Sequence, residues 1–260
     1  MPVPKAVDKI QPTTDRTTRF KPATVSTKRR IIAAVEGGEK SGKSTLALTA
    51  PQPLYVMNFD KGLEGVVDKF LGLTEFGPGD IYVAHYDVPE VPIQADKDKY
   101  LETWEQFVGD YKYALKNAAS IAIDSGSEMW ELHRLARFGK LTQVLPRDYG
   151  PVNAEQSQIY KDAYETDVNL LVTFQLHGEY VNDKATGKQV RRGFNQSPYL
   201  VQMNVRTEHH SRRGFVANVV DCRLAAWLYG AEFAVDAEPP YDTTVEQGLT
   251  IPRVLDLIYP

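Results

Sequence analysis

Short apolar runs alternate with helical patterns along the first two thirds of the chain. Five runs have the length and composition of buried strands, at 31–35, 54–59, 81–85, 120–124 and 170–174. Apolar residues recur at helical spacing in the segments between and beside them, at 44–50, 62–71, 100–119, 128–138 and 153–168. Repeated alternation of strand and helix predicts an α/β fold with right-handed crossovers and a mostly parallel sheet flanked by helices.

The pattern changes after residue 175. Between Glu179 and Asp221 it is typical of short strands, with turn-forming residues at 182–187 and 209–214. We therefore predict two β-hairpins joined by a short helical turn near Ser197, as a C-terminal extension of the parallel sheet. The expected division of the chain is a flexible basic arm at 1–28, one core with its hairpins at 29–225, and an acidic C-terminal extension with a short terminal helix at 226–260.

Composition narrows the class of protein. The 260 residues are 42% hydrophobic and 25% charged, which is typical of a soluble globule, and no apolar run approaches the roughly 20 residues of a membrane span. The only cysteine, Cys222, excludes an intrachain disulfide and a cysteine-rich metal site. We expect a cytoplasmic protein without a membrane partner.

Charge is unevenly distributed along the chain. The net charge of −4 excludes a protein that coats nucleic acid by charge alone, but residues 1–30 carry eight Lys or Arg against two Asp. This arm is either a contact for a polyanion or a solvated leader, and the sequence leaves both interpretations open.

The segment at residues 37–45 has the spacing of a P-loop: a glycine, four residues, then Gly-Lys-Ser. It lies between a predicted strand and a predicted helix, where backbone N–H groups can wrap closely around phosphate if glycines allow it. Lys43 is expected to reach the β and γ phosphates of ATP, and the Ser44 hydroxyl to ligate Mg²⁺. The predicted ATP-binding residues are Gly37, Gly38, Glu39, Lys40, Ser41, Gly42, Lys43, Ser44 and Thr45.

An acidic residue at the end of a neighbouring strand completes such a site. Asp124 follows the apolar run Ile121-Ala122-Ile123, and we expect it to hold the magnesium through water. The alternative is that the turn it begins caps the next helix, with Ser127 in that role.

Hydrolysis also needs a group that positions the attacking water. Asp60, at the tip of the second predicted strand, is the first candidate. Glu64 is the second candidate, and the alternative for Glu64 is that its charge only complements the dipole of a helix. After the fifth strand, Gln175 and His177 are candidate sensors of the γ-phosphate.

The order of these parts resembles the RecA-like recombinase core. The P-loop, with its glutamate at Glu39, looks like the family's Gly-Pro-Glu-Ser-Ser-Gly-Lys-Thr loop, and Ile121 to Ser125 is similar to its hydrophobic-Asp-Ser segment. Further likeness, to the phage ATPases of the Sak type, lies in three segments: Tyr149-Gly150-Pro151-Val152-Asn153, Arg191 to Phe194, and Val201 to Arg206. Asp60 departs from the pattern, because the family places a glutamate there.

The resemblance implies a RecA-like P-loop ATPase that assembles into a ring or filament and binds single-stranded DNA during recombination or annealing, in the host cytoplasm if a phage encodes it. Residues 178–214 hold seven basic residues against three acidic ones. The expected DNA contacts are Lys184, Lys188, Arg191, Arg192, Arg212 and Arg213. Tyr180, Phe194 or Tyr199 could stack on bases. One basic residue of this region could instead reach a neighbouring subunit's γ-phosphate.

Two other functions compete with this one. A P-loop motor or assembly factor without annealing activity would carry the same ATP site. A small-molecule P-loop kinase would need an arginine-rich lid, and Lys140, Arg147 and Lys161 do not cluster as such a lid would.

Overall fold

The computed structural model describes residues 28–60, 62–71, 80–89, 91–182, 184–211, 214–234 and 250–259. Its strands are β1 (Ile32–Gly37), β2 (Leu54–Asn58), β3 (Ile81–His85), β4 (Ser120–Asp124), β5 (Asn169–Val181), β6 (Lys184–Arg191), β7 (Met203–His210), β8 (Gly214–Cys222) and β9 (Glu232–Ala234). Its α-helices are α1 (Lys43–Leu48), α2 (Lys97–Asn117), α3 (Gly126–Phe138), α4 (Tyr149–Tyr164), α5 (Ser197–Leu200) and α6 (Ile251–Ile258). Short 3₁₀ turns are η1 (Val67–Phe70), η3 (Gln94–Asp96), η4 (Pro146–Asp148) and η5 (Ala226–Leu228).

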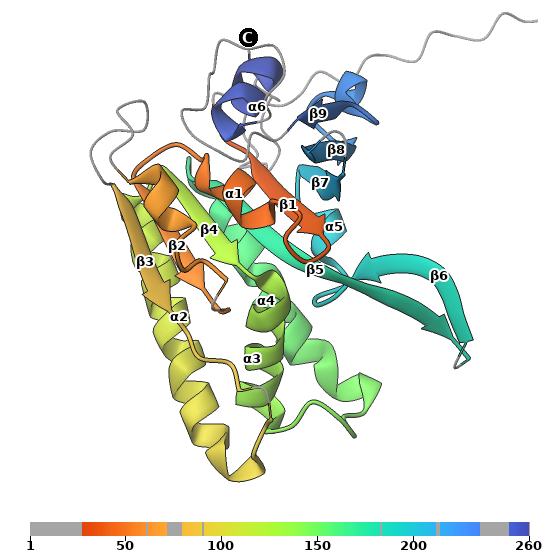
Figure 1. Ribbon diagram of the computed structural model, residues 1–260. Coiled ribbons are helices and arrows are strands. Elements are labelled where there is room, and N and C mark those ends of the chain that lie inside the picture. Colours follow the sequence, from red (N-terminus) through yellow and green to blue (C-terminus); the bar gives the residue numbers. More distant parts are fainter. Residues whose placement is uncertain are drawn as a thin grey trace, which may run out of the picture.

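The strands form one mixed sheet in the order β3-β2-β4-β5-β1-β7-β8-β9, with β6 paired to β5 (Figure 1). The strands from β3 to β7 in this order are parallel to their neighbours, whereas β8, β9 and β6 pair in the antiparallel sense. The predicted fold class is therefore confirmed. β5 lies between β1 and β4, so the carboxyl ends of these two strands and the point where β5 passes beyond them, at Gln175, lie at one edge of the sheet.

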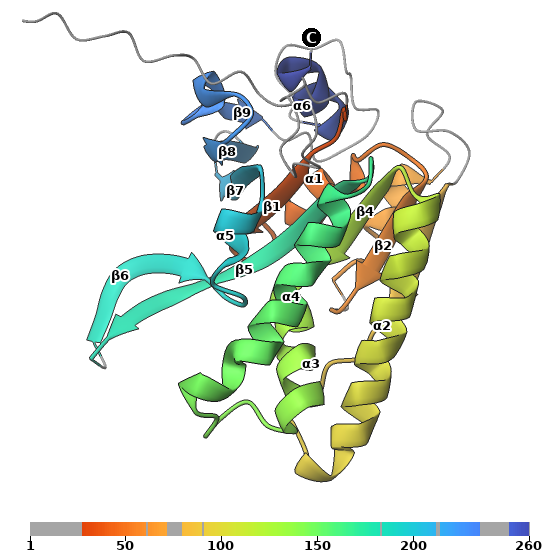
Figure 2. The same cartoon turned by 180° about the vertical axis from the view of Figure 1, so that it is seen from behind.

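Alternation along the buried strands divides the core into two layers. In β1 the side chains of Ala33 and Val35 face one layer with α1 and α6, and those of Ile32 and Ala34 face the other. The second layer is covered by α2, α3 and α4, which lie side by side in both views (Figures 1 and 2). This burial on both faces is the reason why the parallel strands appear as continuous apolar runs in the sequence.

Two predicted helices need correction. The segment 62–71 is not an α-helix: its described residues form turns and the 3₁₀ turn η1. Helix α4 begins at Tyr149, four residues before the predicted start, so Gly150 and Pro151 lie inside its first turn. Proline is tolerated there because the first N–H groups of a helix have no partner within the helix.

The two predicted hairpins are present, and α5 stands between them as expected. Strand β5 continues to Val181, beyond the predicted end at residue 174, so the β5–β6 hairpin projects away from the body of the molecule (Figures 1 and 2). The end of the chain also returns to the core, since Ile251 and Val254 of α6 are buried in the α1 layer. The predicted domain boundaries stay a prediction, and residues 1–27 of the predicted arm lie outside the described residues.

Candidate functional site

The P-loop begins where β1 ends. A Cβ added to Gly37 would lie 2.3 Å from Ser41 Oγ and 2.5 Å from Thr207 Oγ1, so only glycine fits at that position. Gly42 has φ 92° and Lys40 has φ 54°, left-handed conformations that curl the loop before α1 begins. The Lys43 ammonium donates a hydrogen bond of 2.5 Å to the Gly38 carbonyl inside the loop.

The loop is one wall of a cavity of about 670 Å³. Apart from the P-loop itself, it is lined by Asp60 just beyond β2, by Asp124 at the end of β4, and by Gln175, where the pairing of β5 with β1 ends. The structure thus brings together four of the five predicted catalytic residues: Lys43, Asp60, Asp124 and Gln175. Parallel strands explain the convergence, because their carboxyl ends lie at the same edge of the sheet.

Asp124 is 3% exposed and faces Ser44 across the cavity floor. Its Oδ2 accepts a hydrogen bond of 2.7 Å from Ser44 Oγ, and its Oδ1 accepts one from Thr173 Oγ1. Burial raises the pKa of this carboxyl, and the hydrogen bonds from Ser44 and Thr173 oppose the rise. Burial likewise lowers the pKa of Lys43, while the nearby carboxylates, Asp124 first, oppose that change.

Ser44 and Asp124 offer two adjacent oxygen ligands, which fit Mg²⁺. In the part of the chain that the structure describes, no group of three His, Cys, Asp or Glu could hold a metal without help. The donor set therefore suits a magnesium ion that takes its remaining ligands from phosphate and water. The helix cap of α3 is Ser125, which accepts a hydrogen bond of 3.3 Å from the Glu128 N–H, and not Ser127 as one interpretation had it.

Asp60 lines a second cavity as well, of about 840 Å³. This acidic cavity also contains Glu128, Glu131 and Arg192. Glu64 lines neither cavity. It is exposed and lines a third cavity, which shares His85 with the acidic one and no residue with the P-loop cavity, and this removes Glu64 from the candidates for the attacking-water position. His177 is exposed, and its Nδ1 faces the Gly178 carbonyl at 3.0 Å.

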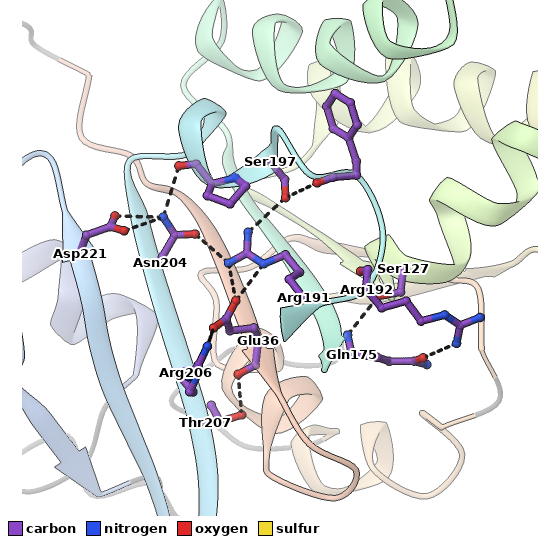
Figure 3. Close-up of polar contacts among 12 residues, drawn as sticks. Glu36, Ser127, Gln175, Arg191, Arg192, Ser197, Asn204, Arg206, Thr207 and Asp221 are labelled. Carbon is purple, nitrogen blue, oxygen red and sulfur yellow. Dashed lines mark hydrogen bonds and ion pairs between the residues drawn. The ribbon is translucent and has the colours of Figure 1, made fainter. Parts of the chain in front are cut away.

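Gln175 is held from two sides. Its side-chain Oε1 accepts a hydrogen bond of 2.7 Å from Arg192, and its backbone N–H donates one of 3.0 Å to Ser127 Oγ (Figure 3). Glu128, beside them, has its pKa raised by burial and by Glu131, with Arg192 acting in the opposite direction.

The predicted DNA contacts divide into three groups. Lys184 and Lys188 are exposed on the projecting hairpin. Arg212 and Arg213 lie outside the described residues. Arg191 is a correction, because its side chain is 9% exposed and paired with Glu36. The Arg192 side chain is 39% exposed and paired with Glu128 and Glu131, and its contact with DNA stays a prediction.

The three aromatic residues proposed for stacking on bases also differ in accessibility. Tyr180 is 70% exposed and Tyr199 is 80% exposed, so both rings are available. Phe194 is 1% exposed and packs at 5.2 Å, centroid to centroid, from the Trp130 ring, which excludes a role in base stacking.

Sequence reasoning missed several residues of the site. Thr173 lies inside an apolar strand, and Thr207 and Phe215 come from the β7–β8 hairpin. The Thr207 hydroxyl is 2.8 Å from that of Ser41, and Phe215 lines the P-loop cavity beside Gly42. No local signal marks Thr207 and Phe215, because the pairing of β7 with β1 brings their hairpin to the loop, and Thr173 is hidden among the apolar residues of β5.

Comparison with known proteins gives one family. A family model described as "AAA domain" matches residues 29–208, which is more than half of the chain and includes the P-loop, Asp124 and Gln175. No curated protein matches the sequence. Within the described residues, no helix is both long and apolar enough to cross a membrane.

Proposed function

Because this chain belongs to the AAA domain family of P-loop ATPase type, we propose that it binds ATP with Mg²⁺ at residues 37–45 and hydrolyses it in an assembly that acts on single-stranded DNA. The observation that carries the ATPase part is the convergence of Lys43, Ser44, Asp60, Asp124 and Gln175 on one cavity. Recombination or annealing by a ring or filament, as in the phage ATPases that the sequence resembles, is the finer part of the proposal.

The residues of the cavity divide the work. Backbone N–H groups of the loop and the Lys43 ammonium bind the phosphates, which requires Lys43 to leave the Gly38 carbonyl. Ser44 and Asp124 would hold Mg²⁺, which supplies positive charge to the phosphate oxygens. Asp60 would orient the attacking water, a role supported by its place in the lining of the cavity and by the hydrogen bond of 2.8 Å that its Oδ1 accepts from the Gly62 N–H. Gln175, which lines the same cavity, would sense the terminal phosphate.

The ATPase part is tested with Lys43→Ala and Asp124→Asn. We expect wild type to release phosphate from ATP only with Mg²⁺, and both variants to lose at least about 100-fold in kcat, a typical cost of removing a charged group that stabilises the transition state. Glu64→Gln is the matched control, because Glu64 lies in a separate cavity and its loss should leave the rate within about twofold. Equal rates for all variants would exclude this site as the source of hydrolysis.

DNA binding is supported by the shape and surface of the β5–β6 hairpin. It projects from the body (Figure 2) and exposes Lys184, Lys188 and the Tyr180 ring. Lysines can contact phosphates, and an exposed aromatic ring can stack on an unpaired base.

The hairpin is tested by salt titration of single-stranded DNA binding. Each lost phosphate contact lowers the slope of log K against log salt by about 0.7, so Lys184→Ala with Lys188→Ala should lower it by about 1.4. The matched control is Lys112→Ala with Lys116→Ala, two exposed lysines on α2. An unchanged slope in the hairpin variant would exclude the hairpin as a DNA contact.

The kinase alternative is tested by the product of the reaction. Transfer of phosphate to a small acceptor in place of water would favour it.

A further inference from the structure

Arg192 directly follows β6 and lines the acidic cavity, which shares Asp60 with the P-loop cavity. Its backbone N–H donates a hydrogen bond of 2.8 Å to the Gln175 carbonyl, and its own carbonyl accepts one of 2.7 Å from Ser127 Oγ. Since Ser127 Oγ also accepts from the Gln175 N–H, a single buried hydroxyl joins the two chain segments (Figure 3). The base of the hairpin is thus tied to Gln175, which lines the P-loop cavity.

Close backbone packing fixes this segment. Gly193 follows with φ 119°, and a Cβ there would lie 3.2 Å from Ser127 Cα. Gly126 is tighter still, but against β5, because a Cβ on it would lie 2.4 Å from the Val172 side chain. Gly193 therefore lets the segment after Arg192 lie directly against the first turn of α3, and Gly126 lets that turn lie against β5.

The guanidinium determines how the Gln175 amide is turned. Arg192 donates to Gln175 Oε1 at 2.7 Å, so the amide oxygen is held toward the arginine. The amide NH₂ carries two hydrogens. The Gln175 side chain is also hydrogen-bonded to the Glu128 carboxylate, which takes one of them, so the other is left to donate. A donor is the group that a phosphoryl oxygen or the oxygen of a water molecule requires.

Arg192 also offsets negative charge at this boundary. It donates to Glu128 at 3.2 Å and to Glu131, two carboxylates that are 17% and 18% exposed. Together with Asp60 they line the acidic cavity next to the P-loop cavity. Without the arginine, uncompensated carboxylates would lie beside the expected position of the terminal phosphate, and like charges repel more strongly where water is excluded.

We propose that Arg192 is a positioning residue for the reaction of this site, which turns the donor of Gln175 toward the terminal phosphate of ATP and compensates Glu128 and Glu131 so that this phosphate is accepted. The proposal rests on the ATPase function proposed above. It gives Arg192 a role inside its own subunit, in place of the DNA contact expected from the sequence.

The two roles predict different effects, which a set of three variants separates. In Arg192→Ala the affinity for ATP should fall about tenfold while that for ADP changes less than about threefold, because only ATP carries the third phosphate, and kcat should fall about 10- to 100-fold with the lost charged hydrogen bonds. Arg192→Lys keeps the charge and loses the planar fork, so ATP affinity should stay near wild type while kcat still falls. Adding Glu128→Gln and Glu131→Gln to Arg192→Ala should restore ATP affinity and leave kcat low.

Nucleotide affinities are measured by competition with a fluorescent ADP analogue, and kcat by phosphate release. A residue that is merely structural would weaken ATP and ADP binding alike, and removing the two glutamates would not restore either one. That result, or wild-type values in all three variants, overturns the role of Arg192 and leaves the proposed ATPase function standing. A wild-type protein that binds neither nucleotide overturns both.

Discussion

Glu36, the residue immediately before the P-loop, carries the sharpest prediction about stability. Its side chain is 8% exposed. Oε2 accepts a hydrogen bond of 2.9 Å from Arg191 Nε and forms an ion pair of 2.8 Å with Arg191 Nη2, while Oε1 accepts a hydrogen bond of 2.8 Å from Arg206 Nε (Figure 3). Arg191 is equally buried, at 9%, so Glu36→Gln would leave its charge without a full counter-charge. The substitution keeps the size of the side chain and removes only its charge.

The expected cost can be estimated from these contacts. Breaking a buried ion pair by removing one partner costs about 3–5 kcal/mol. The lower end applies here, because Arg191 also donates to Ser197 Oγ at 3.1 Å and Asn204 Oδ1 at 2.9 Å, and both bonds survive the change. A loss of about 3 kcal/mol corresponds to a fall in Tm of about 6–12 °C for a chain of this size.

Urea unfolding followed by tryptophan fluorescence measures this cost. The control is Glu208→Gln on β7, whose side chain is 46% exposed and pairs with His210 at 3.3 Å; it should cost less than about 1 kcal/mol, as exposed pairs do. If the free energy of unfolding of Glu36→Gln were within about 1 kcal/mol of that of wild type, Glu36 and its two arginines would not be what holds β1 to β6 and β7.

Two further predictions concern the same measurements. Gly37→Ala should lower the free energy of unfolding by about 1–3 kcal/mol, because its methyl group would meet Ser41 and Thr207. Gly38→Ala, with open space around the added methyl group, should change that free energy by less than about 0.5 kcal/mol. Equal losses in the two variants would contradict the described loop. His133 is buried and its ring stacks on Trp104 at 3.9 Å, with Glu155 Oε2 at 3.1 Å from its Nε2 and Arg137 beyond that carboxylate. Burial lowers the pKa of His133 in the folded state. The neutral imidazole therefore contributes fully to stability above the unfolded pKa of about 6.5. This contribution is lost as the pH falls below about 6.5, by at most about 1.4 kcal/mol per pH unit. Unfolding at pH 7.5 and 5.5 should show a smaller loss in His133→Gln than in wild type, and identical losses would exclude His133 as the source.

Local patterns predicted much of the fold correctly. The strands at 81–85 and 120–124 have the predicted bounds, because short apolar runs between turn residues can be identified without knowing their partners. The segment 62–71 was predicted wrongly as a helix, since apolar spacing alone does not show that Gly65, with φ 73°, interrupts the backbone. The extension of β5 to Val181 was missed because its outer half is exposed and carries no apolar run.

The sequence by itself determined the P-loop, the acid at Asp124 and the mostly parallel sheet. Each of these depends on residues that are neighbours in the chain or on the period of single elements. Only the tertiary structure decided which polar groups meet. Arg191 and Arg192 are adjacent, yet they lie against different partners, Glu36 and Glu128, that are 155 and 64 residues away in the sequence. Charge in the sequence favoured DNA for both arginines, but their contacts with buried carboxylates depend on strand pairing, and pairing between distant segments leaves no local pattern to identify.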